Sequence, residues 1–598
     1  MKNMKKILAL LIAVLMVATM IPAMAADEFD AKVSVTGLAA GDVAHFYKVI
    51  EWVGETTDDS DVSGWKAVAP FTTILGKDAL FAALIGTTQA TQADVDKSDS
   101  DGITAVGQWI EPTGITAELA GQLARAVGTT AGTEVPVTTD KAELTVDKAG
   151  MYMALITPVD ADTIYNPVFV SSDYTAGGTN TLAMPALDAA SYSDSAAAKK
   201  SKVTLEKTAD TTEEAWDDGK SHTTAVGDTV TFTVVTTVPG YAGVYEHPYF
   251  ELSDTLNALA LVTSSVELVD PAKTLEVGAD KDYTIEATAS GYTVKFTEAY
   301  LKSHIAATEV TVTYSAIVTT DAAYAINPEK NEVQIKYTHD PKSETDYDVK
   351  KDSTQHYTFT LDADAVTSHD LYKGKKTSEL VKVGLNADGT PYIERTETSA
   401  ITSSEHWEGP LPGAVFGLFT DAAGTVPYKA KDTDGNIIDQ AVTATTQDDG
   451  RMTFSGLDAG TYYLKEISAP AGYVTNSDVV KIVIEAEVEE VEVTEQILGK
   501  EVTYKTDILK SYSVTVGEGT NATTSTYTFN NDKTPNSNDI QWEECAPIEK
   551  PHQFQNVKGV ELPSTGGMGT TLLYVGGSIL VILAAILLIT KRRMSAND

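Results

Sequence analysis

Residues that could carry enzymatic chemistry are sparse in this chain of 598 residues. Its nine histidines are scattered, so no group of them has the spacing of a zinc site. The chain also lacks a Gly-x-Ser-x-Gly nucleophile turn and a glycine-rich phosphate loop. Asp432–Asn436 has the alternating carboxylates of a calcium-binding loop but not the later carboxylate, so we interpret it as a turn. We therefore expect no enzyme activity, no cofactor and no bound metal.

A pentapeptide near the C-terminus precedes a segment that could hold it at a membrane. The apolar residues 570–590 are long enough to cross a bilayer, and the basic Lys591–Arg593 would keep the far end in the cytoplasm. A proline stiffens the pentapeptide as an extended chain that fits an enzyme groove. An ordinary single-span membrane protein with a chance pentapeptide is the alternative. The five residues are Leu562, Pro563, Ser564, Thr565 and Gly566.

This arrangement resembles the cell-wall sorting signal of Gram-positive sortase substrates, and we assign residues 562–598 to the motif, the transmembrane helix and the basic tail. In that family a cysteine transpeptidase cleaves between the positions that match Thr565 and Gly566. The resemblance implies a membrane-bound precursor that becomes covalently attached to the cell wall, or to copies of itself.

The N-terminal residues 1–25 have the order of a secretory signal peptide. Three lysines precede an apolar run that is short for a membrane span, and the segment ends in the small-x-small site Ala23–Ala25. An N-terminal anchor helix is the alternative. The formal net charge of −41 argues against nucleic acid as a partner. Cys545 is the single cysteine, so the chain cannot form an intramolecular disulfide and needs another kind of crosslink or none.

Between the two signals we expect three domains of mainly β structure. In the first, Thr116 can cap one helix and Asp78 can open another, which predicts a mixed α+β domain. Later runs such as Val230–Thr236 and Val310–Tyr314 are β-branched and aromatic, as in tandem immunoglobulin-like β-sandwiches. The expected divisions are 26–195 for the first domain, 196–355 and 356–533 for two β-sandwiches, and 534–561 for a polar wall spacer.

The string Tyr462–Tyr473, YYLKEISAPAGY, is the most distinctive internal motif. It resembles the E-box of B-type collagen-adhesin domains and of sortase-assembled pilins, with Ile467 where threonine is usual. The middle domain resembles the companion isopeptide domain of pilins through Leu205–Thr208, Phe250–Leu256 and Asn331–Tyr337. These resemblances imply a lysine and an asparagine joined by an intramolecular isopeptide bond beside an acidic side chain.

Burial explains why such a bond could form. A buried lysine loses its charge and becomes a nucleophile, and a buried carboxyl that keeps its proton can polarise the amide and relay protons. The resemblance implies Lys207, Asp254 and Asn331 for the middle domain, with Asp254 as the catalytic acid.

For the third domain, the same resemblance implies Lys382, the E-box carboxyl Glu466 and Asn531. Phe-x-Asn spacing favours Asn531 over the alternative Asn530. An insertion before Lys382 leaves three nearby lysines as alternatives, namely Lys373, Lys375 and Lys376.

A pilus backbone also needs a lysine that attacks the enzyme-bound threonine of the next subunit. The family's Tyr-Pro-Lys-Asn motif is absent here, but Ala197–Ser201 lies at the junction of the first two domains and resembles an Ala-Lys-Lys-Ser variant. That alignment points to Lys199, with Lys200 close behind, unless both are solvated linker lysines.

We therefore interpret the chain as the structural subunit of a sortase-polymerised pilus that supports adhesion. The alternatives are a monomeric wall-anchored adhesin that binds a host ligand and a surface enzyme. The expected partners are pilus-specific and housekeeping sortases, identical pilin subunits, minor pilins, peptidoglycan and a host surface ligand.

Overall fold

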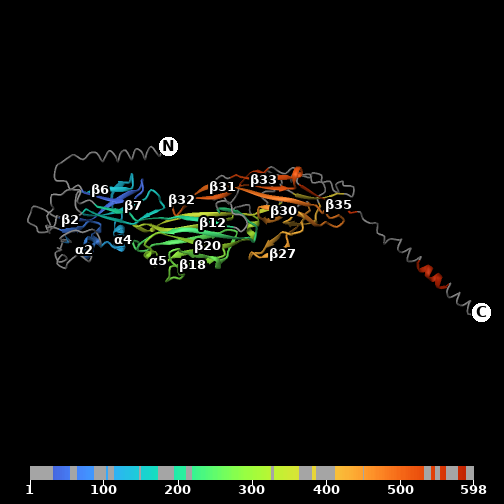
Figure 1. The fold of residues 1–598 in the computed structure, drawn as a ribbon, viewed down its shortest axis with the longest axis horizontal. Coiled ribbons are helices and arrows are strands. Elements are labelled where there is room, and N and C mark those ends of the chain that lie inside the picture. Colours follow the sequence, from blue (N-terminus) through green and yellow to red (C-terminus); the bar gives the residue numbers. More distant parts are fainter. Residues whose placement is uncertain are drawn as a thin grey trace, which may run out of the picture.

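The computed structural model is mainly β and is drawn out along one axis, with three domains in chain order (Figure 1). It describes residues 31–53, 64–85, 103–104, 114–146, 150–172, 194–210, 219–324, 329–361, 380–385, 411–448, 450, 452–530, 541–545, 552–559 and 577–586. The predicted signal peptide and the pentapeptide 562–566 lie outside these residues. The mainly β fold class predicted from the sequence is confirmed.

The first domain is mixed, as predicted: its described residues form two larger sheets, the strand pair β11-β8 and two α-helices. One sheet has the order β4-β3-β2-β7-β9, with β5 paired to β2, and the other has the order β10-β1-β6. Thr116 caps α4, because its Oγ1 accepts the backbone N–H of Leu119 at 3.2 Å. The elements are β1 (Ala31–Thr36), β2 (Val43–Val53), β3 (Gly64–Ala67), α2 (Lys77–Ile85), β4 (Ile103–Thr104), α4 (Ala117–Ala126), β5 (Thr133–Pro136), β6 (Lys141–Val146), β7 (Gly150–Thr157), β8 (Thr163–Tyr165), β9 (Val168–Ser172), β10 (Asp194–Ala197) and β11 (Lys200–Lys202).

The middle domain is a sandwich of two sheets around one core. One sheet has the order β12-β14-β20-β16, with β17 paired to β20, and the other has the order β13-β22-β21-β15-β19-β18. Every second residue of β14 is buried, which places Val230, Phe232 and Val234 in the core between the sheets. The elements are β12 (Leu205–Asp210), β13 (Ser221–Thr223), β14 (Thr229–Val238), β15 (Phe250–Leu256), β16 (Leu259–Leu261), β17 (Glu267–Val269), β18 (Tyr283–Thr288), β19 (Gly291–Phe296), α5 (Glu298–Ser303), β20 (Thr308–Val318), β21 (Glu329–Asp340) and β22 (Ser343–Tyr357).

The third domain has a seven-stranded sheet in the order β28-β25-β30-β31-β32-β33-β34 and three strand pairs, β23-β29, β24-β35 and β26-β27. Its elements are β23 (Phe359–Leu361), β24 (Leu380–Leu385), β25 (Val415–Phe419), β26 (Lys429–Lys431), β27 (Ile437–Ala441), β28 (Thr443–Thr445), β29 (Phe454–Leu457), β30 (Gly460–Ser468), β31 (Val479–Ile497), β32 (Lys500–Val516), β33 (Thr523–Asn530), β34 (Gln541–Cys545) and β35 (His552–Val557). Asp432–Asn436 is a turn that Asp432 stabilises by accepting the backbone N–H of Asn436 at 2.8 Å.

The predicted wall spacer at 534–561 was wrong for the residues of β35. This strand pairs in parallel with β24 from Leu380↔His552 to Leu385↔Val557, and Phe554 is buried in the core of the third domain. The domain therefore extends to Val557, because a strand at this late position closes its sheet structure.

The domains contact one another through polar and backbone contacts. The long hairpin of β31 and β32 reaches back along β22 of the middle domain, where Ser353 Oγ lies 3.0 Å from Thr506 Oγ1 and Lys351 pairs with Glu495 at 2.9 Å. At the junction of the first and middle domains, α4 packs closely against the backbone of the middle domain. A Cβ on Gly121 would lie 1.7 Å from the carbonyl oxygen of Val244. Both junctions are therefore specific contacts between domains.

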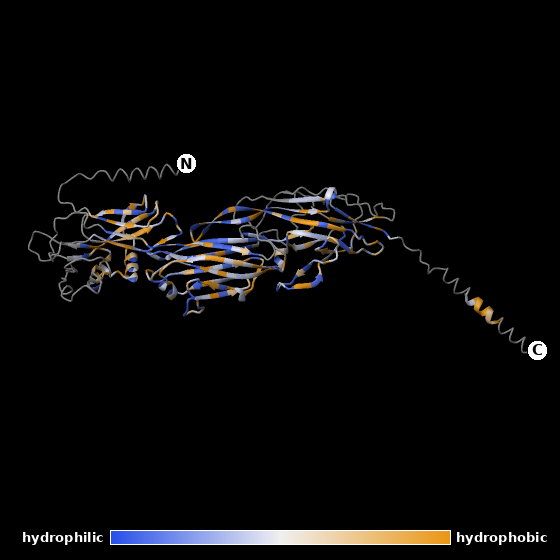
Figure 2. Ribbon diagram, viewed as in Figure 1, coloured by the Kyte–Doolittle hydropathy of each residue, from blue (hydrophilic) through white to orange (hydrophobic). Residues whose placement is uncertain are grey.

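Hydrophobic and hydrophilic residues alternate along many strands, as expected of sheets with one face on a core (Figure 2). A helix at residues 577–586 is hydrophobic along its length and exposed (Figure 2). Within the described residues, no helix has both the length and the hydrophobicity needed to cross a membrane.

Candidate functional sites

Three strands place the predicted middle-domain residues together inside the sandwich. Lys207 lies on β12 in one sheet, whereas Asp254 and Asn331 lie on the neighbouring strands β15 and β21 of the facing sheet. Asp254 pairs with Val333, and Asn331 pairs with Leu256, so the alternation of the strands points both side chains to the core face. All three residues are buried.

The contacts between these side chains are close and continuous. Lys207 Nζ lies 2.7 Å from Asp254 Oδ1, 2.8 Å from Oδ2, and 2.6 Å from Asn331 Oδ1. Asn331 Nδ2 donates to the hydroxyl of Tyr314 at 2.7 Å, and that hydroxyl donates to Asp254 Oδ2 at 2.8 Å. The rings of Phe232 and Tyr314 lie 5.4 Å and 5.5 Å from Nζ, so apolar surface surrounds the amine.

This environment favours the neutral forms of both ionisable groups. Burial lowers the pKa of Lys207 to about 8, although Asp254 acts in the opposite direction. Burial raises the pKa of Asp254 above its usual range, against the influence of Lys207. A neutral amine beside an amide carbonyl, with a protonated carboxyl in contact, can attack that carbonyl. The predicted trio therefore has the geometry and the electrostatics for an acyl transfer.

A second trio lies in the third domain. Lys382 on β24 contacts Asn556 Oδ1, and its Nζ lies 3.1 Å from Oε1 of Glu466 on β30. Asn556 Nδ2 donates to the same Oε1 at 2.8 Å, and the other oxygen of Glu466 accepts the backbone N–H of Asn476 at 2.6 Å. All three side chains are buried, and burial lowers the pKa of Lys382 to about 8.

The asparagine in this site is not the one chosen from the sequence. The predicted Asn531 and the alternative lysines Lys373, Lys375 and Lys376 lie outside the described residues. The amide beside Lys382 belongs to Asn556, because β35 pairs with the strand that carries the lysine. The Phe-x-Asn spacing that favoured Asn531 also occurs in Phe554-Gln555-Asn556. The sequence pattern therefore fits both asparagines.

Comparisons with known proteins agree with this architecture. Residues 400–497 match the family model of the prealbumin-like fold domain SpaA, and residues 555–595 match the LPXTG cell wall anchor motif. The trypsin-resistant surface T6 protein of Streptococcus pyogenes is 22% identical over 472 residues, which are 74% of this chain and 79% of that protein. The T6 backbone pilin of serotype M6 Streptococcus pyogenes, a modular three-domain structure, superposes with a TM-score of 0.50 at 15% identity, covering 90% of this chain and 100% of that chain. The full-length major pilin SpaD of Corynebacterium diphtheriae has a TM-score of 0.37 at 17% identity, over 74% of this chain and 88% of that chain.

The chain therefore carries a prealbumin-like SpaA domain and an LPXTG cell wall anchor motif, and it is similar to Gram-positive, sortase-assembled major pilins. It is accordingly an exported protein of the cell surface that is attached to the cell wall. Pilins of this class are structural proteins and not enzymes.

The two candidate linking lysines differ in their surroundings. Both are exposed at the junction of β10 and β11. Lys200 donates from Nζ to the carbonyl of Gly37 at 3.1 Å and lies 5.7 Å from the ring centre of Tyr165. Lys199 has no side-chain partner among the described residues, and its backbone carbonyl accepts the N–H of Asn166 at 3.0 Å. The backbone is therefore held in place while the Lys199 amine projects into solvent.

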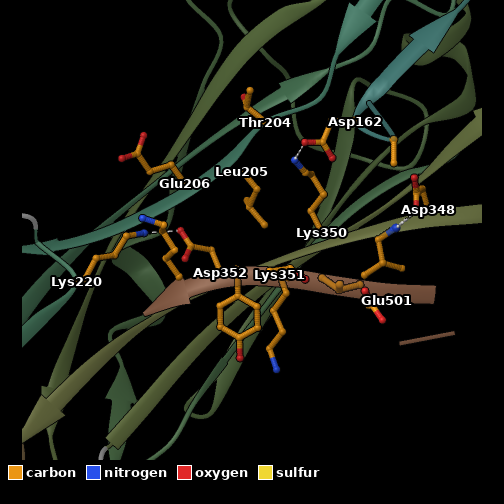
Figure 3. Close-up of a pocket in the computed structure, with 16 residues that line it drawn as sticks. Asp162, Thr204, Leu205, Glu206, Lys220, Asp348, Lys350, Lys351, Asp352 and Glu501 are labelled. Atoms are coloured by element: carbon orange, nitrogen blue, oxygen red, sulfur yellow. Dashed lines mark hydrogen bonds and ion pairs between the residues drawn. The ribbon is translucent and has the colours of Figure 1, made fainter. Parts of the chain in front are cut away.

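A cleft of about 460 Å³ lies where all three domains of the chain meet (Figure 3). Its charged walls pair with each other: Lys350 contacts Asp162 at 2.5 Å, and Lys220 contacts Asp352 at 2.5 Å (Figure 3). Asp352 also accepts the backbone N–H of Lys207 at 2.7 Å. The Lys350–Asp162 pair therefore links the middle domain to the first domain, and Asp352 helps to hold the strand of Lys207 in position.

Proposed function

We propose that this chain is the repeating backbone subunit of a covalent surface pilus. In this proposal two isopeptide bonds, Lys207–Asn331 and Lys382–Asn556, stabilise the subunit internally. The observation that carries the proposal is the contact of Lys207 Nζ with the amide oxygen of Asn331 at 2.6 Å, in a fully buried site with a carboxyl beside it. The same combination of residue types recurs in the third domain around Lys382.

Each bond would form without a cofactor. The neutral lysine Nζ attacks Cγ of the asparagine, and the carboxyl takes up the proton that Nζ loses. The Cγ–Nδ2 bond then breaks, Nδ2 gains a proton, and ammonia leaves. The products are one secondary amide and one ammonia, and the carboxyl is regenerated. Asp254 and Glu466 have this role in the middle and third domains respectively.

Intact-mass measurement of the mature chain tests the internal bonds. We expect the purified protein, residues 26–565, to be lighter than its sequence mass by two ammonia molecules. Peptide mapping should locate one loss at Lys207–Asn331 and the other at Lys382–Asn556. A mass equal to the sequence mass would refute both bonds. A loss of one ammonia would support only the bond to which peptide mapping assigns that loss.

Between subunits, we propose that Lys199 is the acceptor of the sortase-bound threonine. Its amine would attack the acyl carbon of Thr565 held on the enzyme's cysteine, and the thiol would leave. The exposed Lys199 side chain supports this choice, since Lys200 is engaged by Gly37 and Tyr165. The same acyl group transferred to peptidoglycan would anchor the finished polymer to the wall, and the pilus would support adhesion.

The test compares wall extracts from wild type, Lys199→Ala and Lys200→Ala strains on a denaturing gel. We expect a high-mass ladder that resists boiling in wild type and Lys200→Ala, and its collapse in Lys199→Ala. A ladder that persists in Lys199→Ala but collapses in Lys200→Ala would move the link by one residue. A single wall-bound band in wild type would favour a monomeric adhesin.

A further inference from the structure

The two buried sites differ in how the carboxyl reaches the amide nitrogen that must leave. In the third domain one oxygen of Glu466 accepts from Asn556 Nδ2 at 2.8 Å and lies 3.1 Å from Lys382 Nζ. That single atom can take the proton from the lysine and return it to the leaving nitrogen. In the middle domain, Asn331 Nδ2 instead donates to a tyrosine hydroxyl.

Tyr314 stands between the carboxyl and the leaving nitrogen of the middle site. Its hydroxyl contacts Asn331 Nδ2 at 2.7 Å and Asp254 Oδ2 at 2.8 Å, while Asp254 Oδ1 contacts Lys207 Nζ at 2.7 Å. The lysine and the leaving nitrogen are thus joined by a chain of hydrogen bonds that runs through both oxygens of Asp254. The site is buried, and these hydrogen bonds give a continuous path for a proton between the two nitrogens.

The position of Tyr314 is fixed by its own sheet, which faces the sheet of Asp254 and Asn331. It lies on β20, where it pairs with Phe232 of β14, and the two rings stack with centroids 4.8 Å apart. Burial raises the pKa of Tyr314 well above its usual value, so the hydroxyl keeps its proton unless it receives another in exchange. A hydroxyl held in this way is suited to pass a proton on rather than to lose one.

We propose that Tyr314 is a catalytic residue of the middle domain, which relays a proton from Asp254 to the leaving nitrogen of Asn331. This inference rests on the proposed Lys207–Asn331 bond. It gives the two cross-links of one chain different chemistry, with a direct transfer by Glu466 in the third domain and a relayed transfer in the middle domain.

The step balances as follows in atoms and protons. Lys207 Nζ forms a bond to Cγ of Asn331 and gives a proton to Asp254 Oδ1. In the tetrahedral adduct Nδ2 is an amine that can accept a proton, so the two hydrogen bonds of the Tyr314 hydroxyl reverse their direction. As the Cγ–Nδ2 bond breaks, Tyr314 gives its hydroxyl proton to Nδ2 and takes the proton that Asp254 carries on Oδ2. Ammonia leaves, the tyrosine and the carboxyl are restored, and no oxidant, metal or cofactor takes part.

The experiment measures both cross-links over time in the same molecules of full-length mature chain. Wild type and Tyr314→Phe are made in a cell-free translation reaction, and samples are denatured at intervals and digested. Mass spectrometry then quantifies the cross-linked peptides of the two sites. The phenylalanine keeps the stacked ring and removes only the hydroxyl. The rate at which the third-domain bond forms serves as an internal reference.

We expect Tyr314→Phe to form the middle-domain bond about 100-fold more slowly and the third-domain bond at the wild-type rate, since a positioned acid–base group typically contributes that much. Tyr337→Phe is the matched control. It removes another buried hydroxyl of the same core, one with no hydrogen-bond partner among the described residues. This control should form both bonds at the wild-type rate.

Hydrogen exchange at the amides of β14 and β20 separates slow chemistry from poor folding. Retained protection with a slow bond supports the relay. A bond formed at the wild-type rate in Tyr314→Phe overturns it, and so does a slow bond that is accompanied by lost protection, because Tyr314 would then be structural. A wild-type chain that never loses ammonia from the middle domain would instead refute the proposed bond itself.

Discussion

Replacement of Lys207 by methionine should expose the stabilising effect of the middle-domain cross-link. Methionine has an unbranched side chain of similar length and no amine, so it fills the space between Phe232 and Tyr314 without a buried charge. Asp254 can remain protonated beside the Tyr314 hydroxyl, which it contacts at 2.8 Å. Lys207→Met therefore removes the bond and leaves little other damage.

The size of the effect follows from the length of chain that the bond encloses. Lys207 and Asn331 are 124 positions apart in sequence. In the chain-entropy treatment used for disulfides, closing a loop of this length in the unfolded state stabilises the folded state by about 5 kcal/mol. For a domain of this size, 1 kcal/mol shifts the melting temperature by about 2–4 °C, so the loss should be about 10–20 °C.

Differential scanning calorimetry of the mature chain measures this shift, with the third-domain transition as a reference in the same sample. Lys220→Met is the matched control, because Lys220 contacts the carbonyl of Lys207 and Asp352 but lies outside the reaction. We expect that control to keep the wild-type mass and to lower the melting temperature by less than Lys207→Met does, because Asp352 keeps its hydrogen bonds to the backbone N–H groups of Lys207 and Ser353. A Lys207→Met midpoint that matches the control, in a wild type that has lost ammonia there, would refute the entropic reasoning.

Three further predictions concern the third domain, the pH dependence and the first junction. Asn556→Ala should be lighter than its own sequence mass by one ammonia and Asn531→Ala by two, as in wild type; the reverse result would identify Asn531 as the partner of Lys382. Burial lowers the pKa of Lys207 to about 8, and only the neutral amine attacks. In a slowed variant, the rate of middle-domain bond formation should therefore rise about tenfold per pH unit below about pH 8 and become constant above it. A rate that does not change with pH in time-resolved mass spectra would contradict this. Gly121→Ala should separate the first two domains, since its Cβ would lie 1.7 Å from the Val244 carbonyl oxygen; faster protease cleavage at that junction is the expected result, and unchanged cleavage would show that the contact adjusts.

The middle-domain site could be predicted from the resemblance of its motifs to the isopeptide domain of pilins, and its strands from their regular pattern. β14 and β20 alternate buried and exposed residues along their lengths, so period-two patterns identify them. The motifs that carry Lys207, Asp254 and Asn331 lie on strands of the same kind, and the structure brings these residues into contact. The helices of the first domain were also predictable, because Thr116 is a local capping signal.

The third-domain asparagine could not be assigned in the same way. β35 buries only Phe554 and Asn556 and exposes residues such as Gln553 and Gln555, so its composition is that of a polar linker. Its pairing with β24 is parallel and brings Lys382 to Asn556, which is 174 positions away, and no local pattern encodes such a contact. The tyrosine between Asp254 and Asn331 was missed for a similar reason, since Tyr314 contributes from the opposite sheet.

The positions of the two proposed bonds determine how tension would pass through a polymerised subunit. A pull between Lys199 and Thr565 enters the middle domain just before Lys207 and leaves the third domain just after Asn556. Each bond connects a residue near the start of its domain to a residue near the end. The force-bearing covalent path therefore bypasses the 124 positions between Lys207 and Asn331 and the 174 positions between Lys382 and Asn556. The enclosed strands cannot be pulled out while the bonds are intact. A bond from Lys382 to Asn556 encloses more of the third domain than a bond to Asn531 would, because β34 and most of β35 also fall inside the closed loop.

Under this reasoning, Lys382→Met subunits stretched by force spectroscopy should extend by the contour length of the third domain alone. An extension that also releases the middle domain would contradict the independence of the two bonds.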